Sequence, residues 1–190
     1  LDAGDTTVAA VNVSQRLVDV CEEVGATLEL TPIGSTNIIT RIRELRTVDA
    51  HVPIAGEGNG GIFFPEYRLV RDGAYVGAKF LELVAERPVT EIVAPYTDYE
   101  NVRINLEYDT DAELDAMLGA AREFAESADA DPNTIDGYRL DYGDAWVLVR
   151  PSGTEPKVRV YAEARSESRA RNLAEEAAGA LRAALDGRDR

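Results

Sequence analysis

Residues 7–30 read TVAAVNVSQRLVDVCEEVGATLEL, and this stretch predicts a strand, a helix and a second strand in succession. Thr7–Val13 is an apolar run rich in β-favouring residues, as expected for a buried strand. Apolar residues then recur at the helical spacing i, i+3, i+4 and i+7, namely Leu17, Val20, Cys21 and Val24. Gly25 ends this helix, and Thr27–Leu30 is the next strand. Cys21 is therefore expected to be a core residue and not a nucleophile.

The same alternation of strand and helix continues to about residue 86. Ile38, Ile42 and Leu45 predict a second helix that runs to about Arg46. Asp72 is the expected N-cap of a third helix, whose apolar side would carry Tyr75, Val76, Phe80, Leu83 and Val84. Strands that alternate with helices in this way predict a mixed α/β sandwich domain over residues 1–86.

A different pattern follows residue 86. Residues 87–95 contain two prolines and little helical periodicity, which predicts a linker. Residues 96–190 then predict the order β-α-β-β-β-α, a small α+β domain with an antiparallel sheet and both helices on one face. The expected strands are Val102–Tyr108, Tyr138–Leu140, Ala145–Arg150 and Lys157–Glu163. The apolar side of the first expected helix carries Leu114, Met117, Leu118 and Ala121. That of the final helix carries Ala170, Leu173, Ala174, Ala177 and Leu181.

The composition excludes several classes of protein. The chain has 190 residues, 45% of them hydrophobic, which fits a folded globular protein and not a disordered acidic tail. A single cysteine excludes a disulfide framework or a cysteine-cluster metal site. The single histidine, His51, makes a Ser-His-Asp triad improbable on composition, and its position beside Pro53 predicts a surface residue.

The charge also limits the partners. The chain has 35 acidic and 20 basic residues, for a net charge of −15, so nucleic acid and anionic membrane are repelled and neither is an expected partner. Only Lys79 and Lys157 are lysines, and dispersed acid with so little lysine favours a halophilic protein, the alternative being an ordinary acidic one. No apolar run approaches the ~20 residues that cross a bilayer, and no signal-peptide pattern opens the sequence, so we expect a cytoplasmic protein.

The first motif is Gly56-Glu57-Gly58-Asn59-Gly60-Gly61, here called the glycine loop. It matches G-x-G-x-x-G formally, but that dinucleotide fingerprint requires a helix after the last glycine, and the extended segment Ile62–Pro65 follows instead. Glu57 accepts hydrogen bonds, and Asn59 both donates and accepts them. Vicinal sugar hydroxyls do both, so the loop predicts carbohydrate binding; the alternative is a mobile hairpin without a ligand.

The second motif is Arg150-Pro151-Ser152-Gly153-Thr154-Glu155-Pro156-Lys157, here called the arginine loop. It joins two predicted strands, and it offers a guanidinium, two hydroxyls and the backbone amides of Ser152, Gly153 and Thr154, which we expect to be free. Lys157 and Arg159 share one face of the next strand, whereas Val158 and Val160 point to the core. Three cations beside a lone Glu155 predict a phosphate site.

Together the two loops resemble those of the α-D-phosphohexomutase family, which includes phosphoglucomutases, phosphomannomutases and phosphoglucosamine mutases. The glycine loop is similar to the sugar-binding loop of the family's domain III, and the arginine loop to the phosphate-binding loop of domain IV. The stretch Phe63–Glu82, in which Arg71-Asp72-Gly73-Ala74 starts a helix, also resembles the archaeal and bacterial phosphoglucomutase/phosphomannomutase branch. The resemblance implies domain III over residues 1–86 and domain IV over 96–190, and the acidity suggests a haloarchaeal member.

The resemblance implies reversible phosphate transfer between the 1- and 6-hydroxyls of a hexose, glucose or mannose, through a bisphosphorylated intermediate. It implies that Glu57 and Asn59 hold sugar hydroxyls and that Arg150, Ser152, Gly153 and Thr154 hold the phosphate, with Lys157 and Arg159 as further candidates. A phosphoserine in domain I and Mg²⁺ in domain II would supply the chemistry. The loops do not distinguish glucose, mannose and glucosamine phosphates.

The sequence departs from the family at the catalytic motifs. It has neither the serine loop, T-x-S-H-N-P, nor the metal loop, D-G-D-x-D-R. We therefore expect a C-terminal half that has no catalytic or metal-binding residue of its own, is inactive alone, and has a hexose phosphate and the missing N-terminal domains as partners. Ser35 stands where some relatives carry a histidine, which leaves its role in proton transfer open. The alternatives are a non-catalytic module that holds a phosphorylated partner, and a stable fragment without an independent role.

Overall fold

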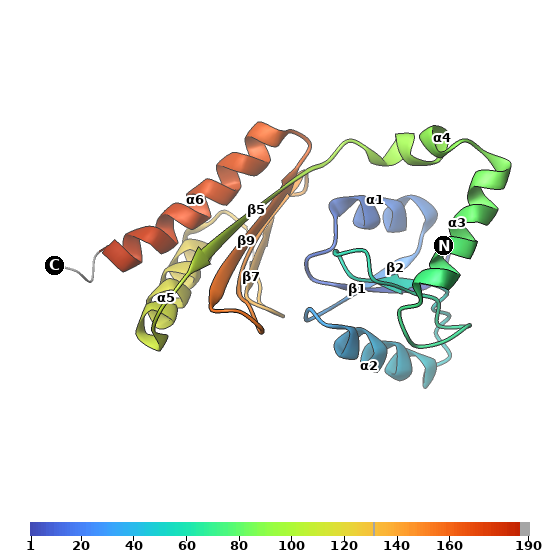
Figure 1. Ribbon diagram of the computed structural model, residues 1–190, viewed down its shortest axis with the longest axis horizontal. Helices are drawn as coiled ribbons and strands as arrows, with labels where there is room; N and C mark the ends of the chain where they lie inside the picture. Colours follow the sequence, from blue (N-terminus) through green and yellow to red (C-terminus); the bar gives the residue numbers. More distant parts are fainter. Residues whose placement is uncertain (131, 187–190) are drawn as a thin grey trace. The chain divides into compact units, whose positions relative to one another are not determined.

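A computed structural model describes residues 1–130 and 132–186 (Figure 1). The chain divides into two compact units, unit 1 over Leu1–Asp98 and unit 2 over Tyr99–Arg190. Each unit has its own sheet and its own hydrophobic core. None of the described helices is long and apolar enough to cross a membrane.

Unit 1 is built on a four-stranded sheet in the order β2-β1-β3-β4. The strands β2, β1 and β3 are parallel, and β4 runs antiparallel to β3. The elements are β1 (Thr6–Ala10), α1 (Gln15–Val24), β2 (Thr27–Thr31), α2 (Ser35–Arg46), β3 (Ala55–Gly56) and β4 (Ile62–Phe63). The predicted α/β sandwich is therefore confirmed, although the first strand ends at Ala10 and not at Val13.

The core of unit 1 lies on both faces of β1, because its five residues are all buried and alternate between the faces. Helices α1 and α2 lie on opposite sides of the sheet (Figure 1). Val8 and Ala10 pack in one cluster with Ile38 and Ile42 of α2. Cys21 of α1 is buried, as the sequence predicts for a core residue.

The last part of unit 1 is helical. Helix α3 (Gly73–Glu86) begins at the predicted N-cap, because Asp72 Oδ1 accepts hydrogen bonds from the backbone N–H groups of Ala74 and Tyr75, both at 3.1 Å. None of the residues of α3 is buried, so the expected apolar side remains largely uncovered. The segment expected to be a linker forms the short helix α4 (Val89–Val93) and begins the 3₁₀ helix η1 (Ala94–Tyr96).

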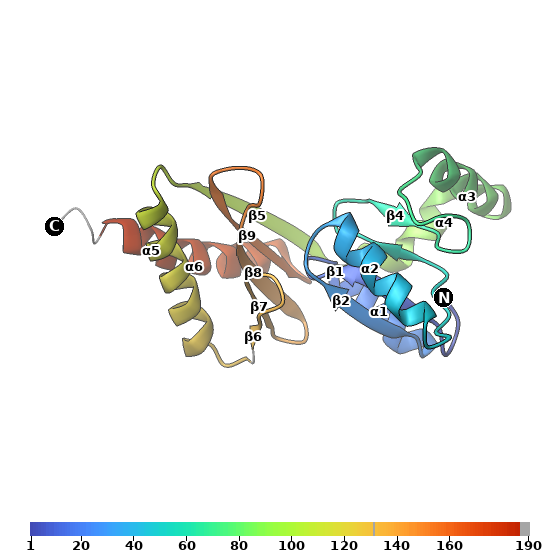
Figure 2. The same ribbon diagram turned by 90° about the horizontal axis from the view of Figure 1, so that it is seen from below.

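Unit 2 is an antiparallel five-stranded sheet in the order β5-β9-β8-β7-β6, which Figure 2 shows from one edge to the other. The elements are β5 (Glu100–Glu107), α5 (Asp111–Ser127), β6 (Pro132–Asn133), β7 (Tyr138–Asp141), β8 (Ala145–Pro151), β9 (Lys157–Ala164) and α6 (Glu167–Asp186). The predicted order is confirmed, and the structure adds the two-residue strand β6 between α5 and β7.

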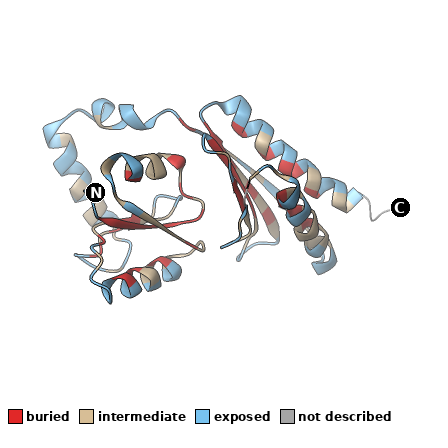
Figure 3. Ribbon diagram, turned by 180° about the vertical axis from the view of Figure 1, so that it is seen from behind, coloured by how far each residue is buried: buried red, intermediate tan, exposed pale blue. Residues whose placement is uncertain are grey.

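The core of unit 2 lies between the sheet and the two helices, which cover the same face. Figure 3 shows its buried residues along the strands and on the inner sides of both helices. Val158 and Val160 are buried in this core with Met117 of α5 and Leu181 of α6. By the period of two, Arg159 belongs to the opposite face of the sheet, as predicted.

Candidate functional site

The glycine loop connects β3 to β4 and is closed by its own hydrogen bonds. The backbone N–H of Glu57 donates to the Gly61 carbonyl at 2.8 Å, and the Gly60 N–H donates to the Glu57 carbonyl at 3.0 Å. The Asn59 Oδ1 accepts a hydrogen bond from the Gly61 N–H at 3.1 Å. These contacts argue against a mobile hairpin. They use one lone pair of the Asn59 Oδ1, so its second lone pair and its amide NH₂ are left for a ligand.

Glu57 is the buried polar group of this loop, with a side chain only 5% exposed. Its Oε2 accepts a hydrogen bond from Arg71 Nη1 at 2.9 Å, and its Oε1 accepts one from the Ser35 hydroxyl at 3.4 Å. The carboxylate is therefore held between the segment that precedes α3 and the first residue of α2. No pattern in the sequence predicts the contact between Glu57 and Arg71, although the motif Arg71-Asp72-Gly73-Ala74 draws attention to that residue.

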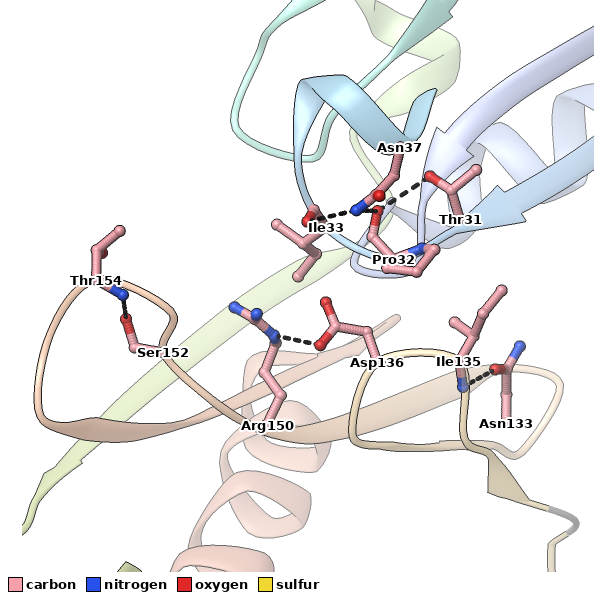
Figure 4. Close-up of polar contacts among 10 residues, drawn as sticks. All are labelled: Thr31, Pro32, Ile33, Asn37, Asn133, Ile135, Asp136, Arg150, Ser152 and Thr154. Atoms are coloured by element: carbon pink, nitrogen blue, oxygen red, sulfur yellow. Dashed lines mark hydrogen bonds and ion pairs between the residues drawn. The ribbon is translucent and has the colours of Figure 1, made fainter. Parts of the chain in front are cut away.

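The turn before Ser35 is fixed by Asn37. The Asn37 side-chain NH₂ donates to the carbonyls of Pro32, at 3.3 Å, and Ile33, at 3.2 Å (Figure 4). The Thr31 hydroxyl donates to the same Pro32 carbonyl at 3.1 Å. These contacts position the start of α2, and with it the hydroxyl that meets Glu57.

Arg150 lies near the end of β8, and Asp136 holds it. The Arg150 Nε donates to Asp136 Oδ1 at 3.1 Å, and the two side chains are only 12% and 16% exposed (Figure 4). The turn that carries Asp136 is closed by the Ile135 N–H, which donates to Asn133 Oδ1 at 3.0 Å. Within the described residues, the two terminal nitrogens of Arg150 have no hydrogen-bond partner.

The backbone amides of the arginine loop are not all free, which corrects the expectation from sequence. The Ser152 N–H donates to the Lys157 carbonyl at 2.8 Å, because the antiparallel pairing of β8 and β9 continues into the loop. The Thr154 N–H makes only a long contact, 3.4 Å, with the Ser152 hydroxyl. The Gly153 N–H has no partner among the described residues. Gly153 and Thr154 are thus the amides available to an anion.

Lys157 and Arg159, the two cations of β9, also have more carboxylate neighbours than the sequence led us to expect. Lys157 Nζ lies 3.1 Å from Glu155 Oε1 and 3.5 Å from Glu107 Oε1, and Arg159 also pairs with Glu155. The hydrogen bond from Lys157, together with that from Arg159, lowers the pKa of Glu155, and the bond to Glu155 raises the pKa of Lys157. With Asp136, three carboxylates oppose three cations, so the prediction of a lone Glu155 was wrong.

Two guanidinium groups nevertheless remain neighbours. Arg150 and Arg159 are directly opposite each other in the β8–β9 register, and like charges in such a position destabilise a sheet unless an anion lies between or beside them. Arg159 Nε is a buried donor without a partner among the described residues. An unsatisfied buried donor costs about 1–3 kcal/mol, which an anion that accepts its hydrogen bond would offset.

The described residues contain no cluster of metal-ligating side chains. Across residues 1–130 and 132–186, no group of three or more His, Cys, Asp or Glu side chains is arranged to hold a metal ion. His51 is a surface residue, 58% exposed, and its side chain pairs with Asp5 and Glu66, neither of which belongs to either loop. The groups that the two loops present are suited to binding hydroxyls and an anion.

Comparison with known proteins assigns both units to one family. Residues 1–99 match the family description "Phosphoglucomutase/phosphomannomutase, alpha/beta/alpha domain III", and residues 101–180 match "Phosphoglucomutase/phosphomannomutase, C-terminal domain".

Three known proteins illustrate the similarity. The chain is 36% identical to a probable phosphoglucosamine mutase from Methanopyrus kandleri and 32% identical to a phosphoglucomutase/phosphomannomutase from Thermococcus kodakarensis; the matches cover 88% and 98% of this chain. A solved phosphoglucomutase/phosphomannomutase family protein from Burkholderia thailandensis matches 97% of the chain with a TM-score of 0.77 and 27% identity. The matched regions span only 36%, 40% and 39% of those three proteins.

Proposed function

The chain belongs to the phosphoglucomutase/phosphomannomutase family, and we propose that it forms the part of a phosphohexomutase that binds the hexose phosphate. Glu57 and the Asn59 amide hold sugar hydroxyls. Arg150, Ser152, Gly153 and Thr154 hold a phosphate, Ser152 through its hydroxyl because its backbone N–H is already bonded. Lys157 and Arg159 add positive charge to the same strand face.

The proposal rests on the burial and the hydrogen bonding of the Arg150 guanidinium. Its guanidinium is largely buried, and Asp136 holds it by Nε alone, while its terminal nitrogens point away from that ion pair (Figure 4). A planar guanidinium held in this way is well suited to donate two parallel hydrogen bonds to a phosphate. Arg159, directly opposite Arg150 in the β8–β9 register, places a second guanidinium on the same face of the sheet.

The loops of this chain position a substrate, and they do not break its bonds. The sequence lacks the serine and metal loops that the family resemblance associates with phosphoryl transfer. We therefore propose that interconversion of hexose 1-phosphate and hexose 6-phosphate needs a further polypeptide segment that supplies a phosphoserine and Mg²⁺, and that this chain alone is inactive. Positioning can supply a large part of the acceleration of phosphoryl transfer once those groups are present.

The proposal is tested by titrating the chain with glucose 1-phosphate, glucose 6-phosphate and inorganic phosphate, followed by NMR of the backbone amides. We expect shifts of the Gly153 and Thr154 signals at millimolar ligand. Arg150→Ala is expected to weaken binding by about tenfold or more, since hydrogen bonds to charged groups contribute ~1.5–3 kcal/mol. Arg150→Lys keeps a charge beside Asp136 but loses the planar fork, so it should bind weakly and yet fold.

Arg171→Ala is the matched control, because Arg171 is an exposed arginine of α6 that pairs with Glu167. It should leave the affinity unchanged. Absence of shifts at Gly153 and Thr154 with all three ligands would refute the phosphate site. Stronger binding of phosphopeptides than of sugar phosphates would instead favour a module that holds a phosphorylated partner.

A further inference from the structure

Arg71 lies outside both loops in sequence and still reaches the buried carboxylate of the glycine loop. Its Nη1 is 2.9 Å from Glu57 Oε2. The Arg71 side chain is 50% exposed, whereas that of Glu57 is 5% exposed. The arginine therefore covers the carboxylate from the solvent side, and it supplies the positive charge that a buried carboxylate needs.

The backbone beside Arg71 is well anchored. The next residue, Asp72, caps α3 through two backbone N–H groups. Tyr67, four residues before Arg71, stacks on Tyr75 of α3 with ring centres 4.1 Å apart, and Phe64 meets Tyr75 edge to face at 5.1 Å. The segment between β4 and α3 is thus fixed on both sides of Arg71, so the direction of its side chain is set by the fold.

Gly61 has no side chain, and the Arg71 side chain lies in the space that a Cβ atom at this position would occupy. A Cβ atom at Gly61 would lie 2.6 Å from Arg71 Cδ and 3.0 Å from Glu57 Oε2. The first distance is too short for two carbon atoms, so any larger residue here would displace the arginine from the carboxylate. The Arg71–Glu57 contact therefore accounts for the presence of a glycine at position 61.

We propose that Arg71 is a positioning residue that holds the Glu57 carboxylate in the orientation in which it accepts a sugar hydroxyl. This inference rests on the proposed function of Glu57. Arg71 bonds one carboxylate oxygen at 2.9 Å, and the Ser35 hydroxyl makes only a long contact, 3.4 Å, with the other, so Arg71 contributes most to restricting rotation of the carboxylate before the ligand arrives. Such preorganisation lowers the entropy cost of binding, and each oxygen retains a lone pair for the ligand.

The experiment follows the amide signals of the whole chain by NMR during titrations with glucose 1-phosphate and with inorganic phosphate. In the unchanged protein, glucose 1-phosphate should shift signals in both loops, whereas inorganic phosphate should shift only those of Gly153 and Thr154. Arg71→Ala should weaken glucose 1-phosphate binding by about tenfold, as read at Gly58 and Gly60. The affinity for inorganic phosphate should stay within about twofold, and the amide signals of β1 and α2 should keep their positions, which a loss of structure in unit 1 would not allow.

Three further variants sharpen the test. Arg71→Lys should restore part of the affinity, because a cation remains beside Glu57. Gly61→Ala should reproduce the loss although Arg71 is still present, since the added methyl group displaces its side chain. Lys79→Ala removes another surface cation with an ion pair of 2.9 Å, to Glu82, and should have no effect.

The outcomes separate this inference from the function on which it rests. If glucose 1-phosphate shifts the glycine loop equally in the unchanged protein and in Arg71→Ala, the positioning role is refuted and the proposed function stands. If it shifts no glycine-loop signal even in the unchanged protein, the assignment of Glu57 is refuted, and the role of Arg71 with it. Loss in Arg71→Ala with partial recovery in Arg71→Lys supports the role.

Discussion

Gly137 sets how closely the turn with Asp136 approaches β8. Its φ is +84°, and a Cβ atom there would lie 2.2 Å from the Val149 carbonyl oxygen and 2.7 Å from Arg150 Cβ. The absence of a side chain at this one position therefore allows the Asp136–Arg150 ion pair to form.

We predict that Gly137→Ala destabilises unit 2 by more than Gly143→Ala does. Gly143 has nearly the same φ, +82°, but open space around its missing Cβ, so its substitution carries only the backbone strain of about 1–3 kcal/mol. Gly137→Ala adds a collision with backbone atoms. Urea unfolding followed by fluorescence of the single, buried Trp146 measures both free energies of unfolding. Equal losses would show that β8 can move away at no cost.

His51 links two acidic residues of unit 1. Its Nδ1 lies 2.7 Å from Asp5 Oδ1, and its Nε2 lies 3.1 Å from Glu66 Oε1. The hydrogen bond to Asp5, with that to Glu66, raises the pKa of His51 above its usual 6.5, and the same bond lowers the pKa of Asp5 below its usual 3.8.

The stability of unit 1 should therefore fall in two pH ranges. The His51 contribution is fully present below pH 6.5 and is lost as the pH rises through the raised pKa of the folded state. The Asp5 contribution is present above pH 3.8 and is lost as the pH falls through its lowered pKa. Urea unfolding between pH 6 and 9, read from amide signals of unit 1, should show the alkaline decline, and His51→Gln should flatten it. The same decline in both proteins would exclude His51 as its source.

At the level of secondary structure, α3 is unusual because it is apolar and has no buried residue. Phe80, Leu81 and Leu83 are 43%, 66% and 47% exposed. A helix that is apolar on most sides is normally covered. The hydrophobic pattern predicted the helix and its cap, but it could not show that the sheet of unit 1 leaves this helix uncovered.

Substitution in α3 should consequently cost little stability. Leu81→Gln is expected to change the free energy of unfolding by at most about 0.5 kcal/mol, as at other surface positions, and to reduce binding of the dye ANS. Ile42→Ala, which removes a buried side chain of α2 from the core of unit 1, should cost about 2–5 kcal/mol. Urea unfolding and ANS fluorescence of both variants make the comparison. A loss for Leu81→Gln as large as that for Ile42→Ala would mean that α3 is packed.

At the scale of the whole molecule, the periodicity of apolar residues in the sequence was sufficient to predict the fold class of both units. Val102–Tyr108 and Lys157–Glu163 alternate clearly and form β5 and β9, whereas β6 has only two residues, too few for a period. The loops could be located because their chemical groups are contiguous in sequence. The ion-pair partners of the loops could not be predicted from the sequence, because they are distant along the chain and come close only when the strands pair. Glu107 meets Lys157 only through the β5–β9 register.

Because Asp136 is already paired with the Arg150 guanidinium, an anion that reaches it either replaces this internal carboxylate or binds to the nitrogens that Asp136 leaves. A halide, which offers one charge and no second acceptor, gains little by replacing it. A phosphate dianion can use the remaining nitrogens without evicting Asp136, and it leaves again easily because the arginine never lacks a counter-ion. The geometry thus favours rapid exchange of a bound phosphate over long residence.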